Sequence, residues 1–161
     1  MKNLKTTGTL IAMICLFLSA NLNAQISTKE LTTAWDNMTN MVVETAKAMP
    51  SNQYTFKPTQ ELRDFASQMQ HTAGANYMFA SVVKLERPKP NPMSKSKNKA
   101  QIVKDMKASF AFIKSGMEKL SADDLKERID FFGRKMSRLQ SILIMTSHLA
   151  MEQGKSTIYT R

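Results

Sequence analysis

Hydrophobic positions recur at helical spacing in four stretches of the chain. In the first, apolar residues follow alternating steps of four and three from Leu31 to Met49, which indicates one buried face of a helix. Ser27 and Glu30 have the spacing of a capping box at its start. Pro50 cannot continue a helix, so we predict that the helix ends there.

A second helix is predicted to begin at Gln60 or Glu61, with Thr59 as its N-cap. Its apolar stripe starts at Leu62 and runs towards Ala80. The members between them are Phe65, Met69, Ala73 and Asn76. Three prolines between residues 88 and 92 then exclude a helix, and the polar stretch 94–99 follows. We interpret this long connection as either a mobile lid or a plain crossover.

The third helix is predicted to begin after Asn98, which has Gln101 three residues later, and its apolar stripe runs from Ile102 to Leu120. A shorter capped segment starts at Ser121, and residues 131–133 indicate an irregular or short extended piece.

The fourth helix is predicted to start at Ser137, with Gln140 completing its cap. It is apolar nearly all round, which is typical of a central helix. Low glycine content argues against an all-β chain. The fold class is therefore all-α: a four-helix bundle of the up-down-down-up type, with the long connection between the second and third helices.

The first residues have the pattern of a secretory signal peptide. A basic start at residues 1–5 precedes an apolar run from Thr9 to Ala20 that is too short to span a membrane, and Ala24 offers a cleavage site. An uncleaved anchor is the alternative. We expect residues 1–24 to be removed, residues 25–161 to form one domain, and the product to be exported to the periplasm or secreted.

Composition narrows the chemistry of the remaining domain. The one cysteine, Cys15, lies in the signal peptide, so the mature chain has no disulfide and no cysteine nucleophile. Loss of Lys2 and Lys5 lowers the net charge from +10 to about +8. The lysines are not interleaved with aromatic residues, so we predict a solvated basic surface, no nucleic-acid partner and no stable membrane insertion. Binding to anionic lipid is an alternative.

His148 and Glu152 carry the strongest candidate chemistry. Residues four apart lie on one helix face, so these two side chains can address one ion, and Tyr159 returns to the same face. A buried carboxylate needs a partner, and metal ligation, an ion pair with Lys155 or one with Arg161 would each provide it.

His71 is the only other histidine in the chain. It lies off the main stripe of the second helix, at the start of a second apolar face. That position suits either a ligand at the mouth of a cavity or an ordinary surface histidine.

Two parts of the sequence resemble the DinB superfamily of metal-binding four-helix proteins, which are related to bacterial thiol transferases. The first comprises residues 56–66 with Gln70-His71 and Asn76-Tyr77, and the second comprises residues 148–155 with Ile158-Tyr159-Thr160-Arg161. The resemblance implies a metal site at one end of the bundle, with His71 as the first ligand and His148 as the second. It covers essentially the whole mature chain.

The sequence departs from the family pattern at three positions. Glu152 stands where the family usually has a third histidine, Gln153 replaces an arginine, and Lys155 replaces a glutamine. The implied metal ligands are His71, His148 and Glu152, for a divalent Zn, Ni, Fe or Mn ion. Glu152 is also a candidate general base if it is not a ligand, and Tyr159 is a candidate catalytic residue.

Two functions follow as hypotheses. The first is a metal-dependent transferase or hydrolase whose small-molecule substrate is unknown. The second is a bundle without metal that binds a small molecule or a partner protein, favoured by the replaced histidine and by the eleven methionines left after signal removal. The sequence permits pairing as a homodimer but does not decide it.

Overall fold

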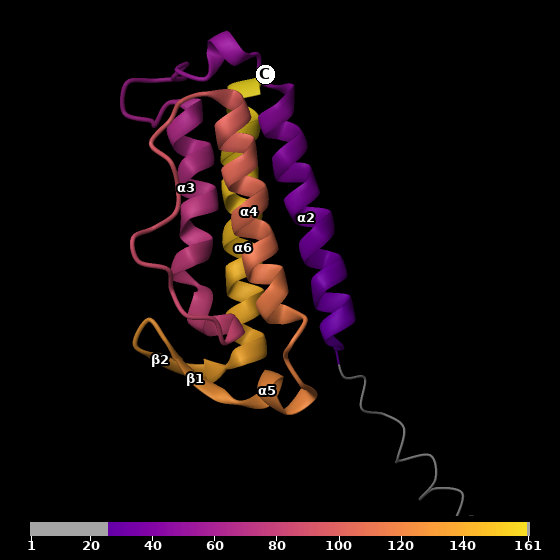
Figure 1. Ribbon diagram of the computed structural model, residues 1–161. Coiled ribbons are helices and arrows are strands. Elements are labelled where there is room, and N and C mark those ends of the chain that lie inside the picture. The colour runs from indigo at the N-terminus through magenta and orange to yellow at the C-terminus, as the bar shows by residue number, and fades with distance from the viewer. Residues whose placement is uncertain (1–25, 161) are drawn as a thin grey trace, which may run out of the picture.

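The computed structural model describes residues 26–160, most of which lie in helices (Figure 1). The predicted signal peptide, residues 1–24, lies outside the described residues. The elements, in chain order, are α2 (Thr28–Ala48), η1 (Ser51–Gln53), α3 (Phe65–Met78), η2 (Ala80–Val83), α4 (Lys99–Met117), α5 (Ala122–Lys126), β1 (Arg128–Phe131), β2 (Arg134–Ser137), α6 (Arg138–Thr157) and η3 (Ile158–Thr160). No helix in the described range is both long enough and apolar enough to cross a membrane.

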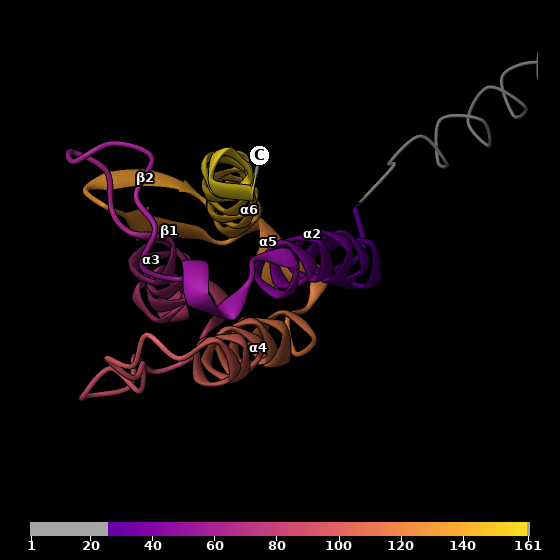
Figure 2. The ribbon, with the colours of Figure 1, turned by 90° about the horizontal axis from the view of Figure 1, so that it is seen from above.

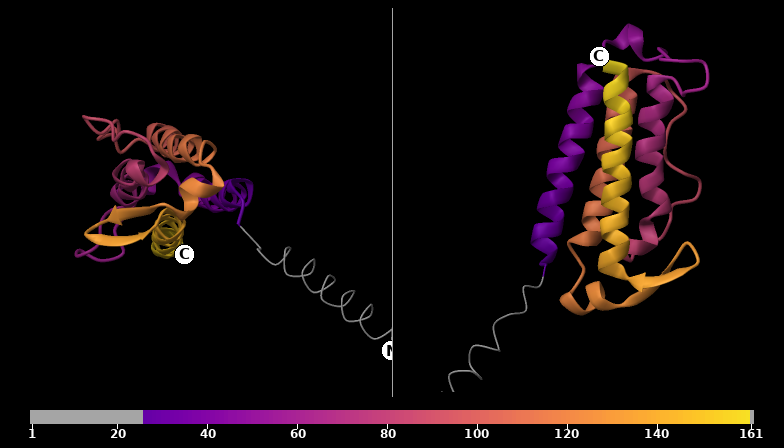
Figure 3. Two further views of the ribbon diagram at one scale, coloured as in Figure 1. Left: turned by 90° about the horizontal axis from the view of Figure 1, so that it is seen from below. Right: turned by 180° about the vertical axis from the view of Figure 1, so that it is seen from behind.

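Helix α2 runs in the same direction as α6, while α3 and α4 run the opposite way (Figures 1 and 3). Seen from above, the four long helices stand at the corners of a square (Figure 2). The end of α2 lies beside the start of α4, where the Lys99 ammonium donates hydrogen bonds to the carbonyls of Lys47 and Met49. The all-α prediction and the up-down-down-up order are confirmed.

Side-chain caps at three helix starts agree with the sequence prediction. Ser27 forms a reciprocal capping box with Glu30 at the start of α2, and Asn98 accepts a hydrogen bond from the Gln101 amide at the start of α4. Ser137 forms a second such box at the start of α6. Each cap satisfies backbone N–H groups that the helix itself leaves without acceptors, so these helix starts can be read from local sequence.

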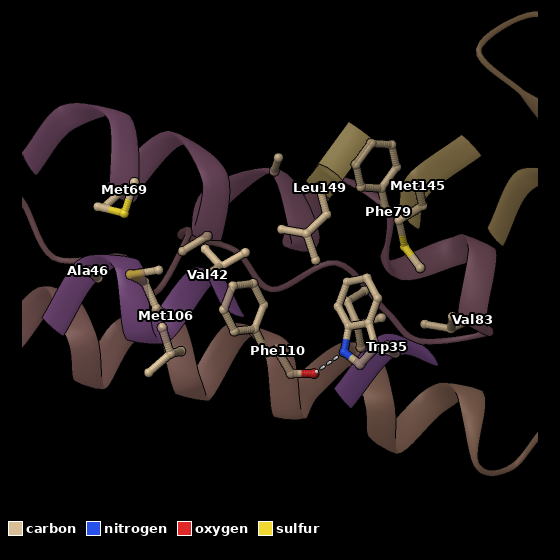
Figure 4. Close-up of a cluster of buried hydrophobic side chains, with 14 of the residues drawn as sticks. Trp35, Val42, Ala46, Met69, Phe79, Val83, Met106, Phe110, Met145 and Leu149 are labelled. Carbon is tan, nitrogen blue, oxygen red and sulfur yellow. Dashed lines mark hydrogen bonds between the residues drawn. The ribbon is translucent and has the colours of Figure 1, made fainter. Parts of the chain in front are cut away.

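The core is built from apolar side chains of all four long helices (Figure 4). Trp35 of α2 is almost fully buried, its ring meets the edge of Phe110 of α4, and its indole N–H donates to the Phe110 carbonyl at 3.1 Å. This bond satisfies the one polar atom of a large buried ring and fixes α2 against α4.

Helix α3 begins later than predicted. Its N-cap is Asp64, which accepts from the Ser67 amide at 2.8 Å, so the prediction of a helix starting at Gln60 or Glu61 after Thr59 was wrong. The preceding residues form a loop, because the Phe65 and Ala66 amides donate to carbonyls of that loop instead of to a helix turn. Leu62, predicted as a core residue, is 43% exposed on this loop.

The second half of the predicted helix also changes form. Helix α3 ends at Met78, and the chain continues as η2 up to Lys84, whose φ of 57° turns it away. The carbonyls of Ser81 and Val82 accept hydrogen bonds from Arg138, a buried side chain at the start of α6. A residue far along the sequence therefore stabilises this end of the helix.

The connection over residues 84–98 runs back along α3 to the start of α4 (Figures 1 and 3). Gln70 of α3 donates to the carbonyls of Ser94 and Ser96 at 3.1 and 2.6 Å, and Ser94 donates to Asp105 of α4. Of the two alternatives, the structure supports a packed crossover.

Helix α6 is not the central helix that its composition predicts. Leu143, Ile144 and Met151 are 44–58% exposed, so α6 occupies a corner of the square and presents an outer face. The short extended piece predicted near residues 131–133 is an antiparallel hairpin of β1 and β2, with Phe132 and Gly133 at its turn.

Gly116 of α4 provides a test of the packing between α4 and η2. A Cβ at this position would lie 2.6 Å from the Val83 carbonyl oxygen, closer than real Cβ contacts. We expect Gly116→Ala to lower the free energy of unfolding by about 1–2 kcal/mol, since backbone must move to make room. Urea unfolding followed by circular dichroism measures the change.

Gly154 of α6 is the matched control, because nothing lies within 4 Å of a Cβ built there. Gly154→Ala should raise the free energy of unfolding by up to about 1 kcal/mol, as alanine favours a helix over glycine. Equal effects of the two substitutions would contradict the close contact between α4 and η2.

Candidate metal centre

His71, His148 and Glu152 come together between α3 and α6. One ligand atom from each lies within 4.8 Å of the others, although His71 is far from the other two in sequence. His71 sits in the middle of α3, and the other two occupy successive turns in the second half of α6. The predicted position at one end of the bundle was wrong, because the site lies part-way along this helix pair.

The two imidazole rings face each other edge to face. Their centroids are 6.0 Å apart with an interplanar angle of 78°. His148 also meets the edge of Phe79, at 5.8 Å, and its side chain remains 27% exposed. His148 is therefore packed on one side and open to solvent on another.

Glu152 is the buried member of the trio, with 1% of its surface exposed. Its Oε2 accepts a hydrogen bond of 2.6 Å from the Gln68 amide, and its Oε1 accepts one of 2.6 Å from the Lys155 ammonium. The same Oε1 lies 4.0 Å from Nδ1 of His148. The ion pair with Lys155, one of the alternatives open from the sequence, is thus present.

Electrostatics favour the protonation states that a cation needs. Burial raises the pKa of Glu152, but the hydrogen bonds from Lys155 and Gln68 outweigh it and leave the pKa below its usual value. Burial, followed by the positive charge of Arg63, lowers the pKa of His71. At neutral pH the cluster therefore contains an ionised carboxylate and an uncharged His71 with a free nitrogen lone pair.

The donor set fits a divalent transition metal. Imidazole nitrogen and carboxylate oxygen bind such ions at about 2.0–2.2 Å, which places ligand atoms about 3.0–3.5 Å from one another. The spacing of up to 4.8 Å is wider, and side-chain rotation of the half-buried histidines can close it. A carboxylate oxygen has two lone pairs, so Oε1 of Glu152 can accept from Lys155 and still face a cation.

Tyr159, a candidate catalytic residue predicted on the face of His148, is not a member of the trio. Its ring packs on Phe65 at 5.6 Å, and its hydroxyl donates to the Arg63 carbonyl at 2.8 Å. Burial raises its pKa, so the phenol is protonated at neutral pH. Tyr159 thus contacts the start of α3 and the loop before it, and its catalytic role stays a prediction.

Two residues around the trio were not predicted from the sequence. Gln68 lies three residues before His71 on α3, a spacing that places both on one helix face and would have identified it as a partner of the site. Arg63 precedes the helix, where no periodicity applies, so only the tertiary structure brings its charge near His71.

Comparison with known proteins shows the family to which the chain belongs. The family model of the DinB superfamily matches residues 34–154, about three quarters of the chain. The chain belongs to the DinB superfamily. A comparison with curated proteins gave no match.

Two solved structures share the DinB fold with this chain. A DinB-like protein from Bacillus subtilis superposes with a TM-score of 0.68 at 18% identity, covering 82% of this chain and 90% of its own. A DinB-like protein from Bacillus cereus gives the same TM-score at 16% identity, covering 81% and 89%. At these identities the likeness concerns the fold.

Asp64 allows a test of how an ion pair stabilises the loop that leads into α3 and carries Arg63. Burial raises its pKa, but the ion pair with Lys97 and the hydrogen bonds from Ser67 outweigh it, and the pKa is lowered. The folded state therefore binds the proton of Asp64 less well than the unfolded state, and the resulting stability is present above the unfolded pKa. This contribution to stability should be lost as the pH falls through the lowered pKa of Asp64 in the folded state.

We expect Asp64→Asn, which can still cap α3, to lower the free energy of unfolding at pH 7 by about 0.5–1 kcal/mol. The difference from the unchanged protein should shrink below about pH 4, where the carboxylate is progressively protonated. Chemical unfolding from pH 2.5 to 7 measures it, with Lys97→Met as the reciprocal variant. A difference that does not depend on pH would contradict the charge-based explanation.

Proposed function

We propose that this DinB protein binds one divalent transition-metal ion between α3 and α6 through His71, His148 and Glu152. The supporting observation is the convergence of both histidines of the chain on a buried carboxylate, all within 4.8 Å. Two imidazoles and one carboxylate form a facial set that leaves coordination positions open for water or substrate. The ion would be Zn, Ni, Fe or Mn.

The residues of the site have separable tasks. Gln68 and Lys155 each hold one oxygen of Glu152, so the carboxylate keeps one orientation without rotating. Because His148 is partly exposed, a small molecule can approach the cluster from solvent. When bound, the ion would supply Lewis-acid chemistry, lowering the pKa of a water or substrate group. A transferase or hydrolase reaction is the activity that we propose for the site.

The ion pair of Lys155 with Glu152 favours a second function. In this pair the Lys155 ammonium balances the charge of the buried carboxylate, so Glu152 is satisfied without a metal ion. The second candidate is therefore a metal-free bundle that binds a small molecule, in which Glu152 is structural or serves as a general base.

We further propose that the protein is exported, on the sequence of residues 1–24 alone. Cell fractionation of the full chain and of a chain beginning at Gln25 should place only the full chain outside the cytoplasm. Equal distributions would contradict export.

Metal content separates the two candidate functions. After native purification, elemental analysis should show close to one equivalent of Zn, Ni, Fe or Mn, and added ion should raise the thermal midpoint of protein stripped with a chelator. Each of His71→Ala, His148→Ala and Glu152→Ala should lower the bound metal, because each removes one of three ligands. Glu152→His should retain it.

Glu44→Ala is the matched control, since this exposed glutamate on α2 lies outside the trio. Metal below about 0.1 equivalent, with no thermal stabilisation by added Zn, Ni, Fe or Mn, would exclude the metal function and favour the second candidate.

A further inference from the structure

A cavity of about 450 Å³ lies beside the metal centre, between the loop before α3 and the end of α6. Gln68 and Lys155 form part of its wall, and these are the two side chains that hold the oxygens of Glu152. A molecule in this cavity therefore contacts the immediate partners of a proposed metal ligand. The volume is within the range of small-molecule sites.

Arg63 is the distinctive charge of the cavity wall. Its side chain is exposed, and it takes part in none of the ion pairs found within residues 26–160. Arg63 lines the same cavity as Gln68 and Lys155, the two hydrogen-bond partners of the Glu152 carboxylate. A guanidinium without a carboxylate partner in the protein can donate hydrogen bonds to the carboxylate of a ligand.

The backbone of Arg63 is held from both sides. The Tyr159 hydroxyl donates to its carbonyl at 2.8 Å, and the next residue, Asp64, caps α3 and pairs with Lys97. The guanidinium therefore extends from an ordered position, and less conformational entropy is lost when a ligand binds.

Two other residues of the wall carry charges, Glu61 and Lys155, and of these only Lys155 is in an ion pair within residues 26–160. Glu61 also lines the cavity, but its exposed carboxylate accepts a hydrogen bond from Thr59 and another from its own backbone. Lys155 is paired with Glu152. Of the two cations of the wall, Arg63 is therefore the one without an ion-pair partner within residues 26–160, and Leu62 and Ile158, which are 43% and 59% exposed, add apolar surface.

We propose that this cavity binds a small amphipathic organic acid, with its carboxylate on Arg63 and its apolar body against Leu62 and Ile158. This proposal rests on the proposed function, because it gives the substrate class of the same site: an organic acid held next to the metal ligands. Bidentate pairing with the guanidinium supplies orientation, and apolar contact supplies affinity.

The test compares two probes of nearly equal shape and different charge, 4-phenylbutyrate and the neutral 4-phenylbutyramide. Isothermal titration calorimetry is performed on protein stripped with a chelator and on protein loaded with Zn. The butyrate should bind at least about tenfold more tightly than the amide in both forms. Arg63→Gln should abolish this preference and leave binding of the amide unchanged.

Arg87→Gln, which removes an arginine outside the cavity wall, is the charge-matched control and should preserve the preference. Thermal unfolding of each variant verifies folding, and Arg63→Lys should restore part of the preference. Equal binding of the two probes, or a preference that survives Arg63→Gln, would overturn the proposal.

The outcomes for the metal and for the acid are distinguishable. Protein that binds metal but shows no preference for the butyrate retains the proposed function and excludes the acid site. Protein that binds no metal but shows a preference dependent on Arg63 supports the acid site and excludes the metal function.

Discussion

The site depends on the burial of one carboxylate. Glu152 is 1% exposed in a bundle whose other interior side chains are mostly apolar, and an ionised group in that position must be paired. Lys155 from the same helix and Gln68 from α3 provide the partners, and the two histidines lie beside it. The pairing of α3 with α6 brings these groups together, so fold and site chemistry are coupled at this residue.

The replacement of a histidine by Glu152 changes more than one ligand. A carboxylate brings a negative charge, and Lys155, which stands where the family pattern has a glutamine, supplies the opposite charge 2.6 Å away. The two departures are therefore complementary, because a buried carboxylate without the lysine would be destabilising. Gln153, the third departure, donates to Thr45 of α2 and so belongs to helix packing rather than to the trio.

Local signals in the sequence were reliable where hydrogen bonds are local. The caps at Ser27, Asn98 and Ser137 each join residues three apart, and all three mark helix starts. The prediction for α3 was wrong at its start because Thr59 offers the same local pattern. Asp64 is the N-cap instead, and it is stabilised by a long-range ion pair with Lys97, which lies in the connection between η2 and α4.

The sequence by itself determined the all-α class and the order of the helices, and it marked His148 and Glu152 as candidate ligands, because periodicity and residue chemistry are local properties. Spacing left the role of His71 open, and the family resemblance joined it to the other two. Tertiary structure alone decided where the site lies and what surrounds it. His71 reaches His148 only through the packing of α3 against α6, and the loop that carries Arg63 is held by the Tyr159 hydroxyl, by the backbone bonds of Phe65 and Ala66 and by the pair of Asp64 with Lys97. Helix α6, apolar nearly all round in sequence, lies at a corner because the four long helices form a square with no central position.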